Sequence, residues 1–481
     1  MRHPIVVDPR QPLGGRRSLS PMTREELSEK LRLALEPVLG HPVVIDSLAR
    51  SPGGASRETW IFRATGPDGS SRRLVLRRDP TGAPSSGLRL EGLLLAAAGR
   101  AGVPVPDVLV VGDDFSELGP GSLIMAFLDG ETIPRRILRD EQLVDVRAGL
   151  AARCGEILAA IHRIPPHDIP GLPGGDPVEQ LRAIVDRLGQ PHPAFELAFR
   201  WLGDNRPSRS AQVVVHGDFR NGNLIVGPDG VRAVLDWELS HLGDPLEDLG
   251  WLCVKAWRFG SPLPVGGFGP VAQLVDAYEK ASGTPVDLDV LHWWEVLGTL
   301  RWGVICIVQT LTHLSGTVRS VELAAIGRRV CEVEWDLLEL LGVVSDADDV
   351  ASGLLSGDAP ATAPTLHDAP SVVELLDAVS EFLLSDVMPA TDGRVRFHAR
   401  VAANVVAMVG RQWTLGSAQD ATYVALLDQL GVTTDAELAD AIRAKHLDDR
   451  KEAVHAAVVF SVAAKLAVAH PGYAAPVRSG L

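Results

Sequence analysis

The stretch Val213-Val-Val-His-Gly-Asp-Phe-Arg-Asn-Gly-Asn-Leu-Ile-Val226, followed by Ala233-Val-Leu-Asp-Trp-Glu238, decides how this chain is interpreted. Each part is a short apolar run of strand character beside acidic and amide side chains. Asp218 and Asn223 stand five residues apart on one loop, and Asp236 ends the second apolar run. We expect a hairpin to bring these three side chains together. Carboxylate and amide oxygens form a hard site that suits Mg²⁺ holding substrate phosphates.

This spacing resembles the catalytic loop of kinases, in which an Asp accepts the proton of the acceptor hydroxyl and an Asn five residues later binds Mg²⁺. The His-Gly-Asp form of the loop is similar to the aminoglycoside phosphotransferase and choline kinase superfamily. Three further segments resemble that family: Leu123-Ile-Met-Ala-Phe-Leu-Asp-Gly130, Ala159-Ala-Ile-His162 and Gly243-Asp-Pro-Leu-Glu-Asp-Leu-Gly250. The resemblance covers residues 25–345. It implies an α+β, bilobal protein-kinase-like fold with a β-rich N-lobe and a mostly helical C-lobe.

Composition excludes several other classes. The chain has 481 residues, 46 % of them hydrophobic, and a net charge of −15, which excludes collagen-like and disordered proteins and argues against a nucleic-acid binder. The four cysteines lack a C-x-x-C pair, so we expect reduced, buried thiols. There is no signal-peptide h-region and no run of about 20 uncharged apolar residues. We therefore expect a cytoplasmic protein that contacts no membrane.

Periodicity and composition divide the chain into five parts. We predict a disordered arm (1–22), a kinase-like N-lobe (23–127), a C-lobe with the catalytic loop (128–345), a linker rich in Asp, Ala, Pro, Gly and Ser (346–370) and a helical domain with an all-α fold (371–481). The last domain contains Phe397-His-Ala-Arg-Val-Ala-Ala-Asn404 and resembles a small uncharacterised helical family. We interpret it as an interaction or substrate-presenting module.

Several helix boundaries are predicted from sequence alone. Thr23 with Glu26, and Ser371 with Glu374, have the spacing of capping boxes that start helices. Helical periodicity is predicted to be continuous over Val321–Leu341. Five helices are expected in the last domain: Ser371–Leu384, Val395–Met408, Tyr423–Leu430, Asp435–Ala444 and Lys451–His470.

The resemblance implies a role for each residue of the catalytic loop. Asp218 is the proton acceptor, and Asn223 with Asp236 binds Mg²⁺. Arg220 stands where protein kinases carry a Lys that faces the γ-phosphate, so it stabilises the transferring charge or, alternatively, pairs with a nearby carboxylate.

Other residues are expected to support the site. His216 is interpreted as a hydrogen-bonding residue that holds the loop rather than as a proton carrier. Asp244 and Asp248 are expected to cap or orient backbone amides. Glu238 either supports the metal site or is a solvated carboxylate.

The N-lobe is interpreted by the same roles, with ATP as the phosphate donor. Backbone amides of a small-residue turn, Gly53, Gly54, Ala55 and Ser56, are candidates for cradling its phosphates, with a plain hairpin turn as the alternative. Arg77 takes the place of the usual phosphate-contacting Lys, and Glu91 is its expected ion-pair partner, with a plain surface salt bridge as the alternative. Met125, on the interlobe segment, is also placed at the ATP site.

The acceptor is the least determined part of the reaction. The predicted pocket helix, His292–His313, offers three tryptophans, Arg301 and a single acid, Glu295, which suits an apolar or anionic acceptor better than a polycation. The alternative is that these aromatic residues are simply part of the core. Four motifs resemble the kinase domains fused to, or encoded beside, acyl-CoA dehydrogenases: Arg57-Glu-Thr-Trp60, Leu76-Arg-Arg78, His216-Gly-Asp-Phe-Arg220 and Gly327-Arg-Arg329. That resemblance implies a 4-hydroxyacyl-CoA as acceptor.

Three functions remain open at this point. The first is an ATP- and Mg²⁺-dependent phosphotransferase acting on the hydroxyl of a hydroxyacyl-CoA in acyl-CoA catabolism. The second is a kinase for an aminoglycoside or another small alcohol. The third is a non-catalytic nucleotide-binding scaffold for an acyl-CoA dehydrogenase, which only the substitution at Arg77 keeps open.

Overall fold

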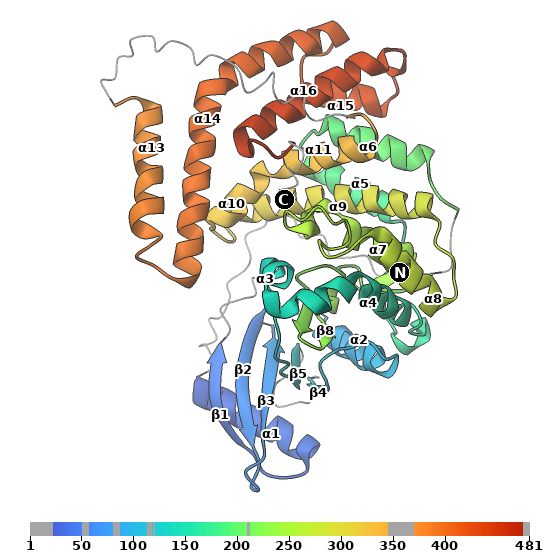
Figure 1. The fold of residues 1–481 in the computed structure, drawn as a ribbon, viewed down its shortest axis with the longest axis vertical. Coiled ribbons are helices and arrows are strands. Elements are labelled where there is room, and N and C mark those ends of the chain that lie inside the picture. Colours follow the sequence, from blue (N-terminus) through green and yellow to red (C-terminus); the bar gives the residue numbers. More distant parts are fainter. Residues whose placement is uncertain are drawn as a thin grey trace, which may run out of the picture.

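The computed structural model describes residues 23–50, 57–79, 87–112, 118, 121–208, 212–344 and 370–474. A β-rich N-lobe, a mostly helical C-lobe and a helical C-terminal domain follow one another along the long axis of the molecule (Figure 1). The predicted bilobal kinase-like fold with an all-α C-terminal domain is confirmed. The predicted arm, 1–22, and nearly all of the predicted linker lie outside the described residues.

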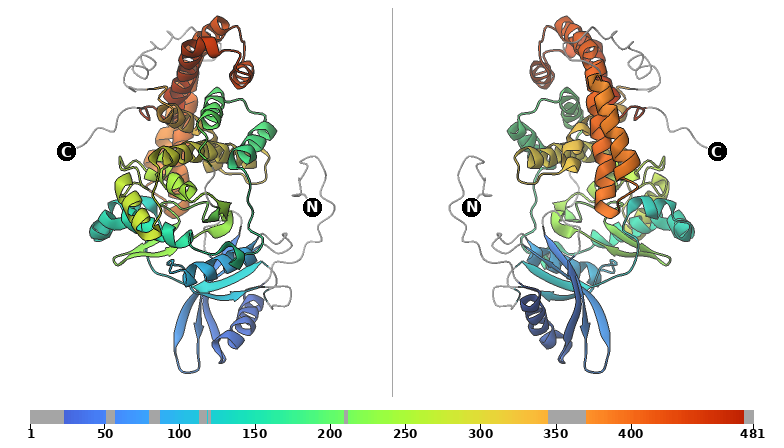
Figure 2. Two further views of the ribbon diagram at one scale, coloured as in Figure 1. Left: turned by 90° about the vertical axis from the view of Figure 1, so that its right-hand side faces the viewer. Right: turned by 90° about the vertical axis from the view of Figure 1, so that its left-hand side faces the viewer.

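One antiparallel sheet of five strands forms the N-lobe, in the order β1-β2-β3-β5-β4. Its strands are β1 (Val44–Arg50), β2 (Glu58–Thr65), β3 (Ser71–Arg78), β4 (Val108–Val111) and β5 (Ser122–Ala126). Helix α1 (Arg24–Leu39) covers one face of the sheet, and α2 (Leu88–Arg100) lies between the sheet and the C-lobe (Figure 2).

Strand β5 joins the two lobes because each of its two faces packs into a different hydrophobic core. Ile124 packs with Leu27 and Leu31 of α1, whereas its neighbours Leu123 and Met125 belong to the core that α2 shares with the C-lobe. Successive side chains of a strand point to opposite faces, so one short apolar strand serves two cores.

Both predicted capping boxes are confirmed. The Thr23 hydroxyl accepts a hydrogen bond from the backbone of Glu26 (3.1 Å), and the Glu26 carboxylate accepts one from the backbone of Thr23 (2.8 Å). Ser371 and Glu374 form the same pair at the start of α13 (Val372–Phe382). Each box satisfies amides that would otherwise lack partners in the first helical turn.

The C-lobe is built from helices around two small sheets. Its helices are α3 (Pro134–Arg139), α4 (Val144–Ile161), α5 (Pro177–Leu188), α6 (Pro193–Asp204), α7 (Leu246–Cys253), α8 (Val271–Ser282), α9 (Leu288–Leu314), α10 (Val321–Arg328) and α11 (Val330–Leu340). Its strands are β6 (Val213–Val215), β7 (Leu224–Gly227), β8 (Gly230–Val234) and β9 (His241–Gly243). Four short 3₁₀ segments connect them: η1 (Glu141–Leu143), η2 (Pro166–Asp168), η3 (Trp237–Leu239) and η4 (Lys255–Arg258).

Strand pairing around the catalytic loop is more complex than the predicted hairpin. Strands β7 and β8 form a hairpin, but β6 pairs with β9, so the loop 216–223 passes from one small sheet to the other. The backbone amide of Leu235 donates to the carbonyl oxygen of Asn223 (2.8 Å). Asp236 therefore still follows β8 beside the end of the loop.

The prediction of one continuous helix over Val321–Leu341 is wrong, because this segment forms two helices. Helix α10 ends at Arg328 and α11 begins at Val330, with Arg329 between them at φ −87° and ψ −2°. The Arg329 guanidinium bonds the Glu332 carboxylate (2.8 Å), which stabilises the junction.

The C-terminal domain shows four α-helices between residues 370 and 474, where five were predicted. They are α13, α14 (Gly393–Leu430), α15 (Asp435–Arg443) and α16 (Lys451–Ala469), with a π-helical turn, η5 (Leu383–Val387), and a 3₁₀ turn, η6 (Asp448–Arg450). Gly410 and Gly416 lower helix propensity in the middle of α14 and conceal its continuity. Hydrogen bonds from Arg411 and Gln419 to carbonyl oxygens of α16 hold this stretch in place.

The C-terminal domain shares a hydrophobic core with the C-lobe. Trp335 and Leu338 of α11 are fully buried and pack with apolar residues of α14, α15 and α16. Helix α16 is long and apolar enough to cross a membrane by length and composition, but 67 % of its apolar window is buried inside the protein. Most of this window therefore belongs to the core that the C-terminal domain shares with the C-lobe.

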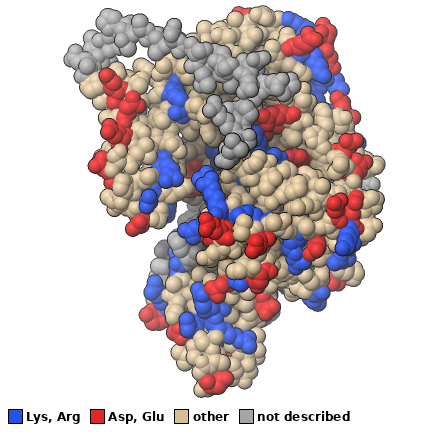
Figure 3. Space-filling view, viewed as in Figure 1, with Lys and Arg blue, Asp and Glu red and all other residues tan. Residues whose placement is uncertain are grey.

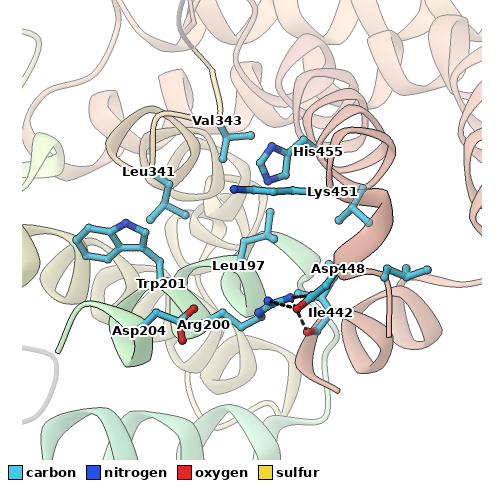
Figure 4. Close-up of a pocket in the computed structure, with 12 residues that line it drawn as sticks. Leu197, Arg200, Trp201, Asp204, Leu341, Val343, Ile442, Asp448, Lys451 and His455 are labelled. Carbon is cyan, nitrogen blue, oxygen red and sulfur yellow. Dashed lines mark hydrogen bonds and ion pairs between the residues drawn. The ribbon is translucent and has the colours of Figure 1, made fainter. Parts of the chain in front are cut away.

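An ion pair also connects the C-lobe to the C-terminal domain at the edge of their shared core. Arg200 of α6 donates to both oxygens of Asp448 (2.6 and 3.0 Å) beside a cavity of ≈ 270 Å³. Trp201 of α6 lines this cavity, and Lys451 and His455 of α16 lie close together at its opposite side (Figure 4). Acidic and basic side chains are interspersed over the face of the molecule shown in Figure 3.

The four cysteines are buried and unpaired with one another, as predicted. They are Cys154, Cys253, Cys306 and Cys331, and burial raises the pKa of each thiol. The thiols are therefore protonated core residues at neutral pH.

The shared core predicts how the C-terminal domain contributes to stability. Leu338→Ala should lower the free energy of unfolding by roughly 2–5 kcal/mol, because it leaves a cavity between C-lobe and C-terminal domain. Leu375→Ala, at an exposed position of α13, is the matched control and should change it by less than about 0.5 kcal/mol. Urea denaturation followed by circular dichroism measures both. Equal effects of the two substitutions would contradict a shared core.

Candidate active site

A fully buried carboxylate, Asp248 on α7, fixes the start of the catalytic loop. It accepts hydrogen bonds from the backbone amides of His216 (2.7 Å) and Gly217 (2.8 Å). His162, just after α4, donates its Nε2 to the same carboxylate (3.2 Å). These contacts match the supporting role expected of Asp248 and tie the loop to two helices.

The surroundings of Asp248 favour its ionised form. Burial alone would raise its pKa, but the hydrogen bond and charge of His162 and the amide of His216 outweigh burial, so the pKa is lowered from its ordinary value. An ionised carboxylate can accept from all three donors at once.

The His-Gly pair at the start of the loop is explained by packing. The buried His216 donates its Nε2 to the carbonyl oxygen of Leu235 (3.0 Å) and accepts at Nδ1 from the backbone amide of Asp218 (3.2 Å). Burial lowers the pKa of His216, which favours the neutral ring that these bonds require. Gly217 has a φ of +77°, and a Cβ there would collide with the carbonyl oxygen of Leu239.

From the part of the chain that the structure describes, the Asp218 carboxylate accepts three side-chain hydrogen bonds. Its Oδ1 accepts from Nε1 of Trp251 (2.9 Å) and Nε of Arg220 (3.0 Å), and its Oδ2 accepts from Nδ2 of Asn223 (2.7 Å). A carboxylate has about four acceptor directions. One direction, on Oδ2, therefore remains for a donor such as an acceptor hydroxyl.

Arg220 is held between this carboxylate and an indole ring. Besides its bond to Asp218, its guanidinium lies 4.5 Å from the centre of the Trp257 ring, a cation–π arrangement. Of the two roles considered for Arg220, the structure shows the pairing with a nearby carboxylate. That carboxylate is the candidate proton acceptor, so the charge of Arg220 lies beside the expected reaction centre.

Asn223 and Asp236 remain the best candidates for a metal site. The amide group of Asn223 donates only to Asp218, and no hydrogen bond within the described part of the chain uses its amide oxygen. Asp236 has a φ of +60°, and its side chain is 48 % exposed. The described residues contain no cluster of three or more His, Cys, Asp or Glu side chains that could hold a metal. The donor set fits Mg²⁺, which is usually completed by phosphate and water oxygens.

Two arginines converge on a buried N-lobe carboxylate, Glu91 of α2. Arg77 of β3 forms the predicted ion pair with Glu91 and also reaches Asp236 (3.4 Å). Arg57, beside β2, bonds the other Glu91 oxygen (2.8 Å) and reaches Glu238 (3.1 Å). Each arginine therefore links Glu91 to a carboxylate of the C-lobe.

The remaining predicted site residues are placed as follows. Gly53, Gly54, Ala55 and Ser56 lie outside the described residues. Met125 is buried in the core between the lobes rather than exposed at a ligand surface. Asp244 accepts a hydrogen bond from the backbone amide of Leu246 (2.8 Å), which stabilises the start of α7.

Three tryptophans from different elements form an aromatic wall beside Asp218. We use this name for Trp251 of α7, Trp257 of η4 and Trp302 of α9, whose successive ring centres are 5.2 and 4.8 Å apart. The Arg301 guanidinium lies 4.9 Å from the centre of the Trp251 ring. Trp251 and Trp257 are only 2 % and 6 % exposed, so the wall is largely a buried apolar layer next to Asp218.

The acids near the aromatic wall are already paired. Glu295, the single acid predicted for the pocket helix, accepts a hydrogen bond from Arg258 (2.8 Å), and Glu247 accepts one from Arg301 (3.2 Å). Burial raises the pKa of Glu295 to about 7, against the charge of Arg258.

Sequence reasoning missed Arg57, Trp251 and Trp257 as site residues. Arg57 opens a motif, Arg57-Glu-Thr-Trp60, that resembles the acyl-CoA dehydrogenase-associated kinases, and this was an available signal. Trp251 directly follows the Gly243–Gly250 segment. No local pattern places Trp257, because its position depends on how η4 packs.

The five-stranded sheet, the loop bearing Asp218 and Asn223, and Asp236 at the end of β8 define a kinase-like phosphotransferase. Residues 47–294 match the Phosphotransferase enzyme family, and the chain belongs to this family. The predicted enzyme class, a phosphotransferase with an alcohol group as acceptor, is confirmed. Residues 389–473 match a Domain of unknown function (DUF6285), which confirms the predicted resemblance of the C-terminal domain.

Two similar proteins are acyl-CoA dehydrogenase family members, in agreement with the resemblance to kinase domains associated with acyl-CoA dehydrogenases. The chain is 32 % identical over 229 residues to mouse acyl-CoA dehydrogenase family member 10, covering 44 % of this chain and 20 % of that protein. It is 30 % identical over 389 residues to chicken acyl-CoA dehydrogenase family member 11, covering 74 % and 47 %. The chain thus spans less than half the length of these relatives. A solved Ralstonia eutropha protein assigned to the aminoglycoside phosphotransferases shares the fold, with a TM-score of 0.52, 24 % identity and coverage of 66 % and 98 %.

The raised pKa of Glu295 predicts a pH-dependent stability. The folded protein keeps a proton on Glu295 up to a pKa of about 7, whereas the unfolded chain releases it near 4.5. The contribution of Glu295 to stability is therefore fully present below the lower value and is lost as the pH rises through the higher one. Relative to wild type, Glu295→Gln should gain unfolding free energy with rising pH, by at most about 1.4 kcal/mol per pH unit. Denaturant titrations across this range measure it, and parallel curves for the two proteins would contradict it.

Proposed function

We propose that the protein transfers the γ-phosphate of ATP, with Mg²⁺, to the hydroxyl group of a hydroxyacyl-CoA of the 4-hydroxy type. The observation that carries this proposal is the acceptor direction on Oδ2 of Asp218 that no described residue uses, next to the aromatic wall. Membership of the phosphotransferase family supports the reaction class, and the chemistry of the wall supports the class of acceptor.

The nucleotide side of the site is assigned to Arg77, Asn223 and Asp236. Arg77, oriented by Glu91, contacts the phosphates of ATP as a planar cation. The carboxylate of Asp236 and the amide oxygen of Asn223 hold Mg²⁺, which, when bound, neutralises charge on the phosphate oxygens. The 3.4 Å contact between Arg77 and Asp236 supports assigning both residues to the nucleotide phosphates.

The transfer itself asks little covalent chemistry of the protein. The acceptor hydroxyl donates to Oδ2 of Asp218, which takes the proton as the new oxygen–phosphorus bond forms. The bond from the γ-phosphorus to the bridging oxygen breaks, and ADP leaves with that electron pair. Trp251 and Asn223 hold the carboxylate in position, and Arg220 stabilises the negative charge that gathers beside it.

The chemistry around Asp218 favours an apolar, anionic acceptor over a polycation. The aromatic wall makes the surroundings of Asp218 apolar, and Arg301 and Arg220 beside it are each paired with a carboxylate, Glu247 and Asp218. An aminoglycoside would need unpaired acids, but Glu295 and Glu247 are engaged by arginines. The similarity to acyl-CoA dehydrogenase family members 10 and 11 supports a thioester acceptor and an acyl-CoA dehydrogenase as partner.

Three other arginines of the C-lobe, Arg319, Arg328 and Arg329, have different surroundings. Arg328 donates to Gln412 of α14 (2.9 Å), and Arg329 pairs with Glu332. Arg319 has no hydrogen bond or ion pair with another described residue. In contrast to these three arginines, Arg301 lies beside the aromatic wall, and it is therefore the candidate for contacting the acceptor.

The test is a phosphotransfer assay with ATP, Mg²⁺ and a 4-hydroxyacyl-CoA, with kanamycin and choline as parallel acceptors. Asp218→Asn should lower turnover by at least about 10²-fold, because the amide cannot take the proton. Asp229→Asn, at the exposed β7–β8 turn, is the matched control and should leave turnover unchanged. Transfer to kanamycin or choline alone would overturn the proposed acceptor. ATP binding without transfer to any of the three would support the scaffold interpretation instead.

A further inference from the structure

The C-terminal domain approaches the acceptor side of the site through one buried carboxylate. Tyr473, beyond α16, donates its hydroxyl to Asp336 of α11 (2.9 and 3.1 Å to the two oxygens). Asp336 is only 5 % exposed and also pairs with Nζ of Lys255 (2.9 Å). Lys255 is the first residue of η4, so a continuous chain of contacts runs from the C-terminal domain to that segment.

Segment η4 is held at both ends and carries Trp257, one of the three tryptophans of the aromatic wall, between them. At its start, Lys255 contacts Asp336 and Glu339 (2.9 Å each) and lies 4.9 Å from the centre of the Tyr473 ring. At its end, Arg258 bonds Glu295 of α9. Trp257, between these anchors, is 6 % exposed.

Trp257 connects η4 to the reacting groups. The Arg220 guanidinium lies over its ring, and Arg220 in turn donates to Oδ1 of Asp218. A displacement of η4 would therefore move the surface on which Arg220 rests. Misplacement of a catalytic group by about 1 Å can cost as much as 10²-fold in rate.

Asp336 differs in this respect from the other buried carboxylates of α11. Glu332 and Glu334 also meet side chains of the C-terminal domain, His470 (3.0 Å) and Lys465 (3.7 Å). Among the contacts described, Asp336 is the one of these three carboxylates that also binds η4. The C-terminal domain is thus anchored at several points, of which one leads to the aromatic wall.

We infer that the C-terminal helical domain is a positioning element of the acceptor site. Tyr473, acting through Asp336 and Lys255, sets the position of η4 and so of Trp257 and Arg220 beside Asp218. Tyr473 touches no reacting atom. The inference rests on the proposed function only in assigning the aromatic wall to the acceptor.

The first test compares two tyrosines of the same domain. Tyr473→Phe removes the hydroxyl on Asp336, and Tyr423→Phe, the matched control, removes a hydroxyl bonded to Asp435 of the same domain. Tyr473→Phe should lower kcat/KM for the acceptor about tenfold, the effect of one lost hydrogen bond, with KM for ATP unchanged. Tyr423→Phe should change neither. Equal kinetic losses in both variants would overturn the inference.

A second readout does not depend on knowing the acceptor. The full chain is labelled with 5-fluorotryptophan, and the ¹⁹F resonance of Trp257 is assigned with Trp257→Phe. Tyr473→Phe should shift this resonance, and Tyr423→Phe should not. An unmoved Trp257 resonance in Tyr473→Phe would overturn the inference. A moved resonance supports it even if no tested acceptor is phosphorylated, a result that would count against the proposed function alone.

Discussion

Asp248 lies fully buried in the C-lobe and accepts hydrogen bonds from two consecutive amides of the catalytic loop and from His162. The rest of the site depends on this arrangement, because it fixes the backbone from which Asp218 projects. Gly217 is required by the resulting turn, and the His216 ring is locked by the backbone on both sides of it. A loop held in this way can present a carboxylate with little reorganisation at the moment of reaction.

A second constraint connects the two lobes. Glu91 is buried and binds both Arg57 and Arg77, and each arginine also reaches a carboxylate that follows β8, Glu238 or Asp236. The buried charge of Glu91 is compensated by the two arginines, and each arginine has a second carboxylate partner. The same contacts hold the segment after β8 against the N-lobe, where the nucleotide phosphates are expected to bind.

The sequence predicts the fold class well, because the fold class and the candidate loop residues both follow from local patterns. Asp218, Asn223 and Asp236 sit at fixed spacings beside apolar strands, and capping boxes mark helix starts at Thr23 and Ser371. The sequence does not predict the pairing of β6 with β9, which is set by tertiary contacts, or the continuity of α14 through Gly410 and Gly416.

The partners of the site residues were harder to predict than the residues themselves. Trp251 bonds Asp218 of the catalytic loop from helix α7, and Arg57 meets Glu91 across 34 residues of chain. Such contacts depend on how elements pack, which no local spacing encodes. The placement of the C-terminal domain on α11 is of the same kind, since its charged partners lie more than one hundred residues away in sequence.

The central claim, that Asp248 holds the catalytic loop, is tested most directly by amide hydrogen exchange in wild type and in Asp248→Asn. The amide side chain keeps one acceptor oxygen and places a donor against the backbone amides of His216 and Gly217. Losing one such bond costs about 1–3 kcal/mol, so exchange at these two amides should become about 5- to 150-fold faster, while exchange in the N-lobe sheet stays unchanged. Unaltered protection of His216 and Gly217 in the variant would contradict the account.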